Sequence, residues 1–124
     1  MRFLSVFVKN SVHPVIEPNL GTLGSEVSER VAAYLKAGVP LMRTTQRVPD
    51  VVTGSPEPVV PISIVTDGKY VWSMAVAHYV ERHHVSPGEE FIAHCEQNRW
   101  AIPELSATEV AACLEFVNAA RRPT

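Results

Sequence analysis

The side chains of this sequence best suited to acid–base chemistry or metal binding are its five histidines, His13, His78, His83, His84 and His94. Imidazole titrates near neutral pH and is a common zinc ligand. His83 and His84 are neighbours, however, and so are His94 and Cys95. Neighbouring side chains on a helix diverge by about 100°, so neither pair can readily share one ion. This spacing predicts no metal site and no cofactor.

The carboxylates that could serve in general acid–base catalysis each have a simpler local role. Asp67 precedes a glycine in a tight turn, and Glu89 and Glu90 fall in the first turn of an expected helix. Glu81 belongs to a solvated helix face. The chain has no Gly-x-Ser-x-Gly motif, and its Gly21–Gly24 turn lacks the spacing of a dinucleotide- or phosphate-binding loop. The sequence therefore predicts no catalytic residue and favours a protein that is not an enzyme.

The helical half of the chain contains residue types that are common at protein–protein interfaces. Arg99 and Trp100 stand in a polar linker, and both types are enriched at the hot spots of protein interfaces. Residues 73–124 are also acidic, with seven carboxylates against four arginines, and such a face would speed association with a basic partner. The candidate partner-binding residues are Glu81, Glu96, Arg99 and Trp100. The alternatives are that Trp100 anchors its loop to the core and that the glutamates are solvated or cap helices.

The two cysteines, Cys95 and Cys113, are too few and too far apart for a disulfide scaffold or a Cys-x-x-Cys motif. Both fall in expected helices beside apolar neighbours. We therefore expect two reduced, buried thiols that pack as small hydrophobic side chains.

The length and composition are typical of one globular domain, which we expect to span residues 1–124. A hydrophobic content of 46% and a charged content of 19% exclude a disordered chain, which would bury too little apolar surface. A net charge of −2 argues against general nucleic-acid binding. No apolar run approaches the roughly 18–20 residues of a membrane span, and the apolar start is too short for a secretory signal. We expect a cytoplasmic protein that is not inserted in a membrane.

Four segments carry helix signals, namely amphipathic spacing of apolar residues combined with capping residues. Ser25 is a good N-cap for the first helix, and Gly38 can adopt the left-handed conformation that ends it. Residues 86–89 and 106–109 form two capping boxes, each with a serine first and a glutamate last, which predict the starts of two helices. The four predicted helices are residues 26–37, 74–83, 87–97 and 107–120.

The strongest strand signal lies at residues 62–72, where two β-prone runs flank Asp67-Gly68. Such a pair predicts a β-hairpin with a type I′ turn, because that turn requires positive φ at both central positions. Phe3–Val8 predicts another strand, and residues 39–61 a proline-rich loop with one short strand at 42–48. Strands followed by helices predict an α+β fold, a two-layer single domain with helices on one face of a small, mainly antiparallel sheet.

Residues 34–96 also carry a distinctive pattern, Thr66-Asp67-Gly68-x-x-Val71-Trp72 followed by Tyr79-Val80 and His83. It resembles a pattern in small actinobacterial proteins of unassigned function, some of which are similar to immunity proteins of toxin loci. The resemblance implies a protein partner, a cognate toxin, and carries no catalytic residues over to this sequence.

Three functions are therefore expected, which fold class alone does not separate. The first is a non-enzymatic protein-binding domain, an immunity protein that neutralises a cognate toxin by occlusion. The second is a small-molecule-binding or catalytic domain with a pocket near His78 and Tyr79. The third is a homo-oligomeric structural module.

Overall fold

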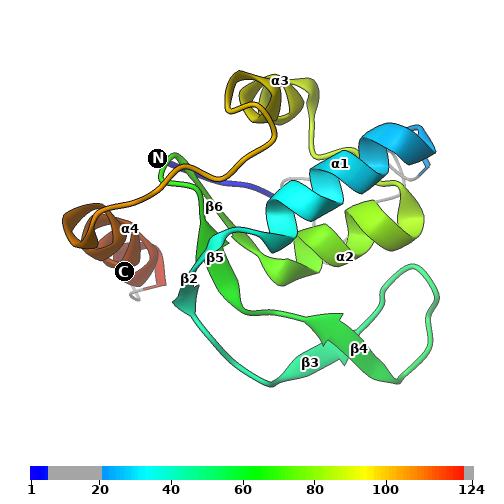
Figure 1. Cartoon of the computed structure of the whole chain (residues 1–124). Helices are drawn as coiled ribbons and strands as arrows, with labels where there is room; N and C mark the ends of the chain where they lie inside the picture. Colours follow the sequence, from blue (N-terminus) through cyan, green and yellow to red (C-terminus); the bar gives the residue numbers. More distant parts are fainter. Residues whose placement is uncertain (6–20, 122–124) are drawn as a thin grey trace.

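The computed structural model describes residues 1–5 and 21–121 and shows helices packed around a small sheet (Figure 1). This is the predicted α+β class, and the predicted helices agree with the observed ones to within two residues at each end. Within the described ranges, no helix has both the length and the apolar character needed to cross a membrane. The elements in chain order are β1 (Arg2–Phe3), α1 (Ser25–Lys36), β2 (Val39–Met42), β3 (Arg47–Pro49), β4 (Pro58–Pro61), β5 (Ile64–Thr66), β6 (Tyr70–Ser73), α2 (Met74–His83), α3 (Glu89–Gln97) and α4 (Ala107–Arg121).

Four strands form one mixed sheet in the order β1-β6-β5-β2. The pairs β6–β5 and β5–β2 are antiparallel, whereas β1 is parallel to β6. The sheet is thus mainly antiparallel, as predicted. Of the predicted strand Phe3–Val8, β1 contains Phe3, which is paired with Val71, and residues 6–8 lie outside the described residues.

The hairpin predicted at residues 62–72 is formed by β5 and β6, but its turn differs from the predicted one. The N–H of Asp67 donates to the carbonyl of Tyr70 at 3.3 Å, so the two central residues are Gly68 and Lys69. Of these two, Gly68 has a positive φ of 97°, and Lys69 does not. A positive φ at only one of the two central positions excludes the type I′ turn, which requires it at both.

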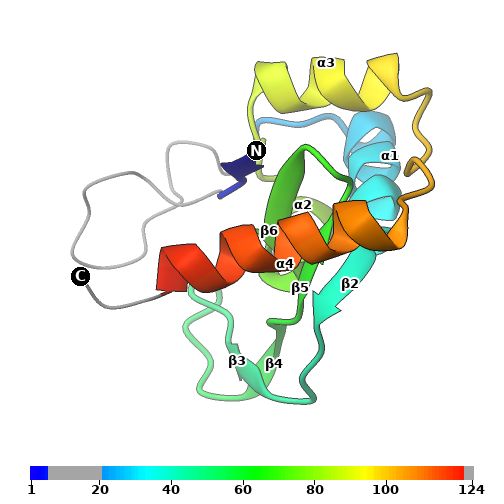
Figure 2. The same cartoon turned by 90° about the vertical axis from the view of Figure 1, so that its left-hand side faces the viewer.

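The sheet is covered on both faces (Figure 2). Val65 and Trp72 belong to the main core, together with residues of α1, α2 and α3. Neighbouring strand residues point to opposite faces, and on the other face Thr66 Oγ1 lies 3.7 Å from Sγ of Cys113 in α4. Helix α4 therefore adds a layer opposite the single helical layer that the sequence pattern predicts.

One of the two predicted capping boxes is present. The Oγ of Ser106 accepts from the N–H of Glu109, and Glu109 Oε1 accepts from the N–H of Ser106, both at 3.1 Å. The capping box predicted at Ser86 is wrong, because α3 begins only at Glu89. Gly88 precedes this helix with a φ of 104°, which a right-handed helix cannot include, and the Oγ of Ser86 accepts from the N–H of Gly88 instead.

Both predictions for the ends of α1 are also corrected. The N-cap is Gly24, so Ser25 is already helical. Gly38 is not among the described residues with positive φ. A Cβ at Gly38 would lie 2.7 Å from Cγ2 of Val65 and 2.9 Å from Cζ2 of Trp72. Glycine is therefore required here for close passage of the chain over the sheet, not for a left-handed conformation.

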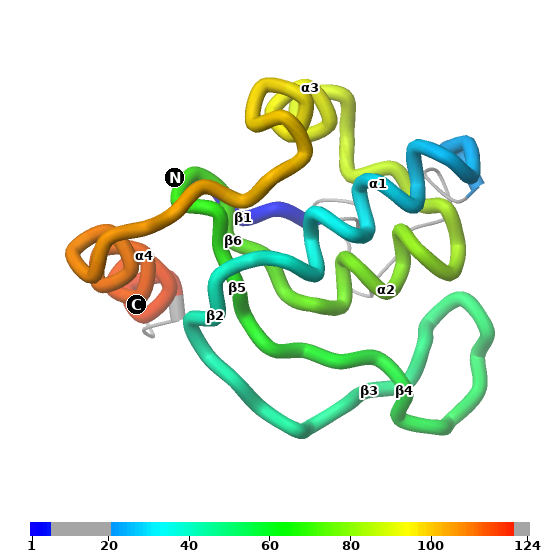
Figure 3. Tube along the Cα trace, in the orientation of Figure 1, coloured from blue at the N-terminus to red at the C-terminus, as the bar shows by residue number. Residues whose placement is uncertain are grey.

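Residues 39–61 contain three strands, where one short strand at 42–48 was predicted. The prediction for 42–48 is wrong, because this segment holds the end of β2, a connection and the start of β3. Figure 3 follows the chain from β2 out to the β3–β4 hairpin and back to β5. Proline is tolerated in this two-stranded sheet because both strands are edges. Val60 of β4 is fully buried, and β4 packs against α2, so this hairpin forms a wall beside α2.

Candidate functional site

A groove of about 730 Å³ lies between the β3–β4 hairpin and α2. Its volume falls within the roughly 300–1,000 Å³ of typical small-molecule sites. His78 is one of its lining residues, whereas Tyr79, the other residue near which a pocket was expected, is buried and is not among them. Its cationic lining residues are Lys36, Arg47 and Arg82.

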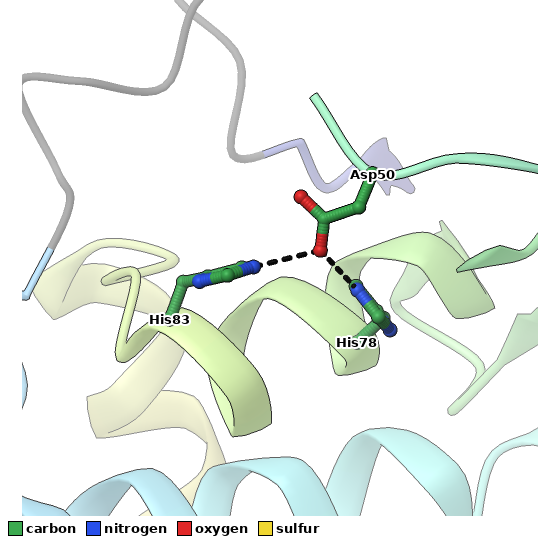
Figure 4. Close-up of side chains that lie close together, drawn as sticks. All are labelled: Asp50, His78 and His83. Atoms are coloured by element: carbon green, nitrogen blue, oxygen red, sulfur yellow. Dashed lines mark hydrogen bonds and ion pairs between the residues drawn. The ribbon is translucent and has the colours of Figure 1, made fainter. Parts of the chain in front are cut away.

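Asp50 is the centre of the polar cluster in this groove (Figure 4). Its side chain is 4% exposed, and its Oδ2 lies 2.7 Å from Nε2 of His78 and 2.7 Å from Nε2 of His83. Its Oδ1 accepts from the backbone N–H of Val52 at 2.7 Å and of Thr53 at 3.2 Å. Both carboxylate oxygens of Asp50 are therefore used, one by α2 and one by its own loop.

These contacts set the protonation state of Asp50. Burial raises the pKa of Asp50, but hydrogen bonds from His78, His83 and the backbone N–H groups outweigh this effect and hold the pKa well below its usual range. The carboxylate is therefore ionised at neutral pH, and its charge is enclosed by four N–H or imidazole partners.

Helix α2 carries both imidazoles, and His83 is its last residue, five positions after His78. Side chains five positions apart diverge by about 140° on a helix, so the two imidazoles reach the same Asp50 oxygen from different sides (Figure 4). His84 follows as the C-cap with a φ of 52°, which terminates the helix at this point. The loop that carries Asp50 is docked on α2 by a further contact, since the N–H of Val51 donates to the Oη of Tyr79 at 3.0 Å. Asp50 thus keeps its place over α2 through its own loop as well as through the imidazoles.

Sequence reasoning missed Asp50 and did not connect His78 with His83. A shared ion was rejected because His83–His84 and His94–Cys95 are neighbours, whereas the structure brings together residues that are five and 28 positions apart. One ligand atom from each of Asp50, His78 and His83 lies within 4.8 Å of the other two. A carboxylate oxygen with two imidazole nitrogens is a donor set suited to transition-metal ions. The only local signal was an aspartate that follows a strand-forming run, which does not reveal its partners.

A second buried carboxylate, Asp67, joins the hairpin turn to α1 and α3. Its Oδ2 accepts from the Oη of Tyr34 and lies near Nε2 of His94, each at 2.6 Å. Asn98 donates to the Oη of Tyr34 at 2.8 Å. Burial raises the pKa of Asp67, but the bonds from Tyr34, the turn backbone and His94 lower it below its usual range. Burial and the nearby Asp67 carboxylate raise the pKa of Tyr34.

This second network, Asp67 with Tyr34, His94 and Asn98, contains one imidazole. Its hydrogen bonds join the hairpin turn to α1 and α3. The Oδ1 of Asp67 accepts from the backbone N–H of Lys69 at 3.0 Å and of Tyr70 at 2.8 Å. The predicted turn role of Asp67 is therefore confirmed. We interpret the network as a structural link between the turn and two helices.

The structure separates Glu81 from the other predicted partner-binding residues. Glu81 lines the groove and pairs with Lys36 of α1, whose hydrogen bond lowers the pKa of Glu81. Glu96 and Arg99 are exposed at the end of α3 and are linked by a backbone hydrogen bond of 2.9 Å. Trp100 is partly buried and packs against the main core, which confirms its anchoring role. The guanidinium carbon of Arg30 lies 6.0 Å from its ring centroid.

Arg99 and Trp100 both have positive φ, at 55° and 59°. Two successive non-glycine residues in this conformation are uncommon. The N–H of Trp100 donates to the carbonyl of Cys95 at 2.9 Å, which closes the end of the helix. The strained turn therefore exposes Arg99 while it directs Trp100 toward the core.

The resemblance of residues 34–96 to small actinobacterial proteins stays a prediction. No protein-family model, no curated protein and no solved structure matches this chain.

Proposed function

We propose that this chain binds a small anionic molecule in the groove between the β3–β4 hairpin and α2. The observation that carries the proposal is the cluster of Asp50, His78 and His83 in the lining of a groove large enough for such a molecule. Pockets that combine apolar walls with a few convergent polar groups are the usual form of ligand sites. This is the second of the functions expected from the sequence.

The charge of the lining favours an anion. Lys36, Arg47 and Arg82 all border the groove, and the exposed carboxylate there is that of Glu81, which pairs with Lys36. The negative charge of Asp50 is enclosed by its hydrogen-bond partners. Guanidinium groups bind carboxylates and phosphates through paired N–H donors, so Arg47 and Arg82 supply the recognition chemistry.

The apolar part of the groove adds contact area for the body of a ligand. Val59 and Pro61 of the hairpin and Met74 and Ala77 of α2 belong to the groove lining. Val59 is 43% exposed, although large apolar side chains tend to be buried. A ligand with both an anionic group and an apolar portion fits this composition best.

The test is titration of isotope-labelled protein with inorganic phosphate, citrate and AMP, followed by amide chemical shifts. At least one probe should shift signals from β3, the loop after it and α2. Arg82→Gln should weaken that binding by about tenfold or more, the scale of one charge-assisted hydrogen bond. Arg99→Gln, an exposed arginine at the end of α3, is the matched control and should not change it. The proposal fails if no probe shifts groove signals, or if both variants affect binding equally.

A second candidate is a protein-binding role, which the sequence resemblance implies for a cognate toxin. The observation that favours it is the turn at Arg99 and Trp100, because non-glycine residues held at positive φ cost roughly 1–3 kcal/mol and cluster at functional sites. Arg99 and Glu96 would then form the contact surface, with Trp100 as its rigid base. Glu81, the fourth predicted residue, lies on α2 in the groove lining, and its partner-binding role stays a prediction.

The protein-binding candidate is tested with the product of a toxin gene adjacent to the gene for this chain. Charge reversal in Glu96→Lys should slow association at low salt, whereas Glu57→Lys, on the β3–β4 connection, should not. If no such gene product binds the chain, or if both variants associate at the wild-type rate, the α3 end is not the interface.

A further inference from the structure

We propose that Asp50, His78 and His83 form a binding site for a divalent transition-metal ion, with Zn²⁺ as the best-fitting ion. The inference deepens the proposed function, because the site lies in the lining of the same groove. Within residues 1–5 and 21–121, these three residues are the one group whose donor atoms converge closely enough to share an ion.

The geometry is close to that of a metal centre. Oδ2 of Asp50 lies 2.7 Å from each imidazole Nε2, and all three donor atoms fall within 4.8 Å of one another. Zinc bonds of about 2.0–2.1 Å with tetrahedral angles place donor atoms roughly 3.3 Å apart. Around an ion the two Oδ2–Nε2 distances would lengthen by about half an ångström, and the two Nε2 atoms, which lie within 4.8 Å of each other, would take a similar separation.

An ion would replace the hydrogen bonds between Asp50 and the imidazoles. The Nε2 atoms that lie at Oδ2 of Asp50 are the atoms that would bind the metal, since an imidazole binds a metal through the lone pair of an unprotonated ring nitrogen. The Asp50 carboxylate would then bind the cation in place of two hydrogen-bond partners.

The loop that carries Asp50 has a contact with α2 besides the bonds between Asp50 and the imidazoles. Oδ1 accepts the N–H groups of Val52 and Thr53, and the N–H of Val51 is held by Tyr79. Oδ2 can therefore turn from the imidazoles to an ion while the loop stays docked.

Three protein ligands leave an open coordination position, as in zinc sites that bind an exchangeable water or ligand. All three residues line the groove, and so do Arg47 and Arg82. An anion that binds there would complete the coordination of the ion and pair with the guanidinium groups. Phosphate and carboxylate groups are the ligand classes that satisfy both requirements.

The test uses the full chain produced without a histidine tag and treated with a chelator. Zn²⁺ binding is measured by calorimetry, and Co²⁺ binding by the visible absorption that reports a four-coordinate site. The wild type should bind one equivalent. His78→Gln and His83→Gln should each weaken Zn²⁺ binding by at least about a hundredfold. Loss of a residue that only hydrogen-bonds to a metal ligand weakens binding by about 10–100-fold, so a larger effect indicates a direct ligand. Circular dichroism and thermal unfolding verify that both variants fold.

Two histidines serve as matched controls. His84→Gln changes the neighbour of His83, and His94→Gln changes the imidazole of the second network, so both should bind Zn²⁺ as the wild type does. The metal proposal is overturned if the wild type binds neither ion, or if His84→Gln weakens binding as much as His83→Gln.

The outcome also separates this inference from the proposed function. The phosphate, citrate and AMP titrations are run once with chelator and once with Zn²⁺. Groove shifts with chelator, in a protein that binds no metal, would overturn the metal site alone. Zn²⁺ bound through His78 and His83 without any groove shift from the anions would overturn the anion-binding function alone.

Discussion

Oδ2 of Asp50 lies 2.7 Å from Nε2 of His83, although the two residues are 33 positions apart in the chain. This contact joins the loop after β3 to the last residue of α2, and the bond to His78 reinforces it. The groove and its polar cluster therefore depend on the packing of the β3–β4 hairpin against α2. Disturbing either side should alter both stability and ligand binding.

Asp50→Ala should destabilise the domain substantially. The substitution leaves the N–H groups of Val52 and Thr53 and both imidazoles without their shared acceptor. The expected loss is roughly 1.5–3 kcal/mol or more, the range for hydrogen bonds to a charged group. Urea denaturation measures the free energy of unfolding, with Glu57→Ala on an exposed loop as the control. Equal stability of the two variants would show that the Asp50 contacts contribute little.

The free energy of unfolding of the domain should decrease as the pH is lowered below about 5. The pKa of Asp67 is lowered in the folded state, so its contribution is complete above the unfolded pKa of about 3.9. That contribution is lost as pH falls through the lower folded pKa, because the unfolded chain then binds more protons.

The Asp67→Asn variant checks the source of this pH dependence. It should be less stable than the wild type at neutral pH and should lose less stability between about pH 5 and pH 2. The pKa of Asp50 is also lowered, so part of the dependence of unfolding free energy on pH should remain in this variant. Urea midpoints over a pH series measure both effects. The same acid slope in both proteins would contradict the role of Asp67.

Gly38→Ala should strain the core where α1 passes into β2. The added methyl group would lie 2.7 Å from Cγ2 of Val65 and 2.9 Å from Cζ2 of Trp72. Overpacking of this kind costs about 1–3 kcal/mol. Gly24→Ala is the matched control, because a Cβ at Gly24 meets nothing within 4 Å. Thermal unfolding should show a lower midpoint for Gly38→Ala than for the control, and the reverse order would refute this packing explanation.

The serines at the starts of the last two helices should differ in their effect on stability. Ser106→Ala removes the N-cap of an observed capping box and should cost about 0.5–2 kcal/mol. Ser86→Ala removes one exposed hydrogen bond to Gly88 and should cost less. Denaturant midpoints of the two variants make the comparison. A larger loss for Ser86→Ala would mean that its contacts have been misjudged.

Both thiols should be unreactive in the folded protein. Cys95 and Cys113 are free and buried. Burial, with a further contribution from the Asp67 carboxylate, raises the pKa of Cys95 to about 12, so little thiolate forms near neutral pH. A colorimetric disulfide reagent should label neither thiol quickly at neutral pH and both in denaturant. Rapid labelling of Cys95 without denaturant would show that its part of α3 opens readily.

The helices and the β5–β6 hairpin could be predicted because their signals are local. The Ser106 capping box joins residues three positions apart, and amphipathic spacing repeats within each helix. Gly68 likewise indicated a turn through its own conformational freedom. The predicted start of α3 was wrong because Gly88 has a φ of 104°, a backbone conformation that the capping-box pattern at Ser86 does not reveal.

Tertiary structure decided the groove, the second sheet and the side of the main sheet that α4 covers. The prolines of β3 and β4 lower the strand signal of each segment, and the two strands are stabilised by pairing with each other and by the burial of Val60. Asp50 shows no local sign of its partners, which arrive from α2, 28 and 33 residues later. Local sequence patterns determine which residues form helices and turns, because those interactions span a few positions. The convergence of Asp50, His78 and His83 requires packing between elements distant in the chain, which no short pattern encodes.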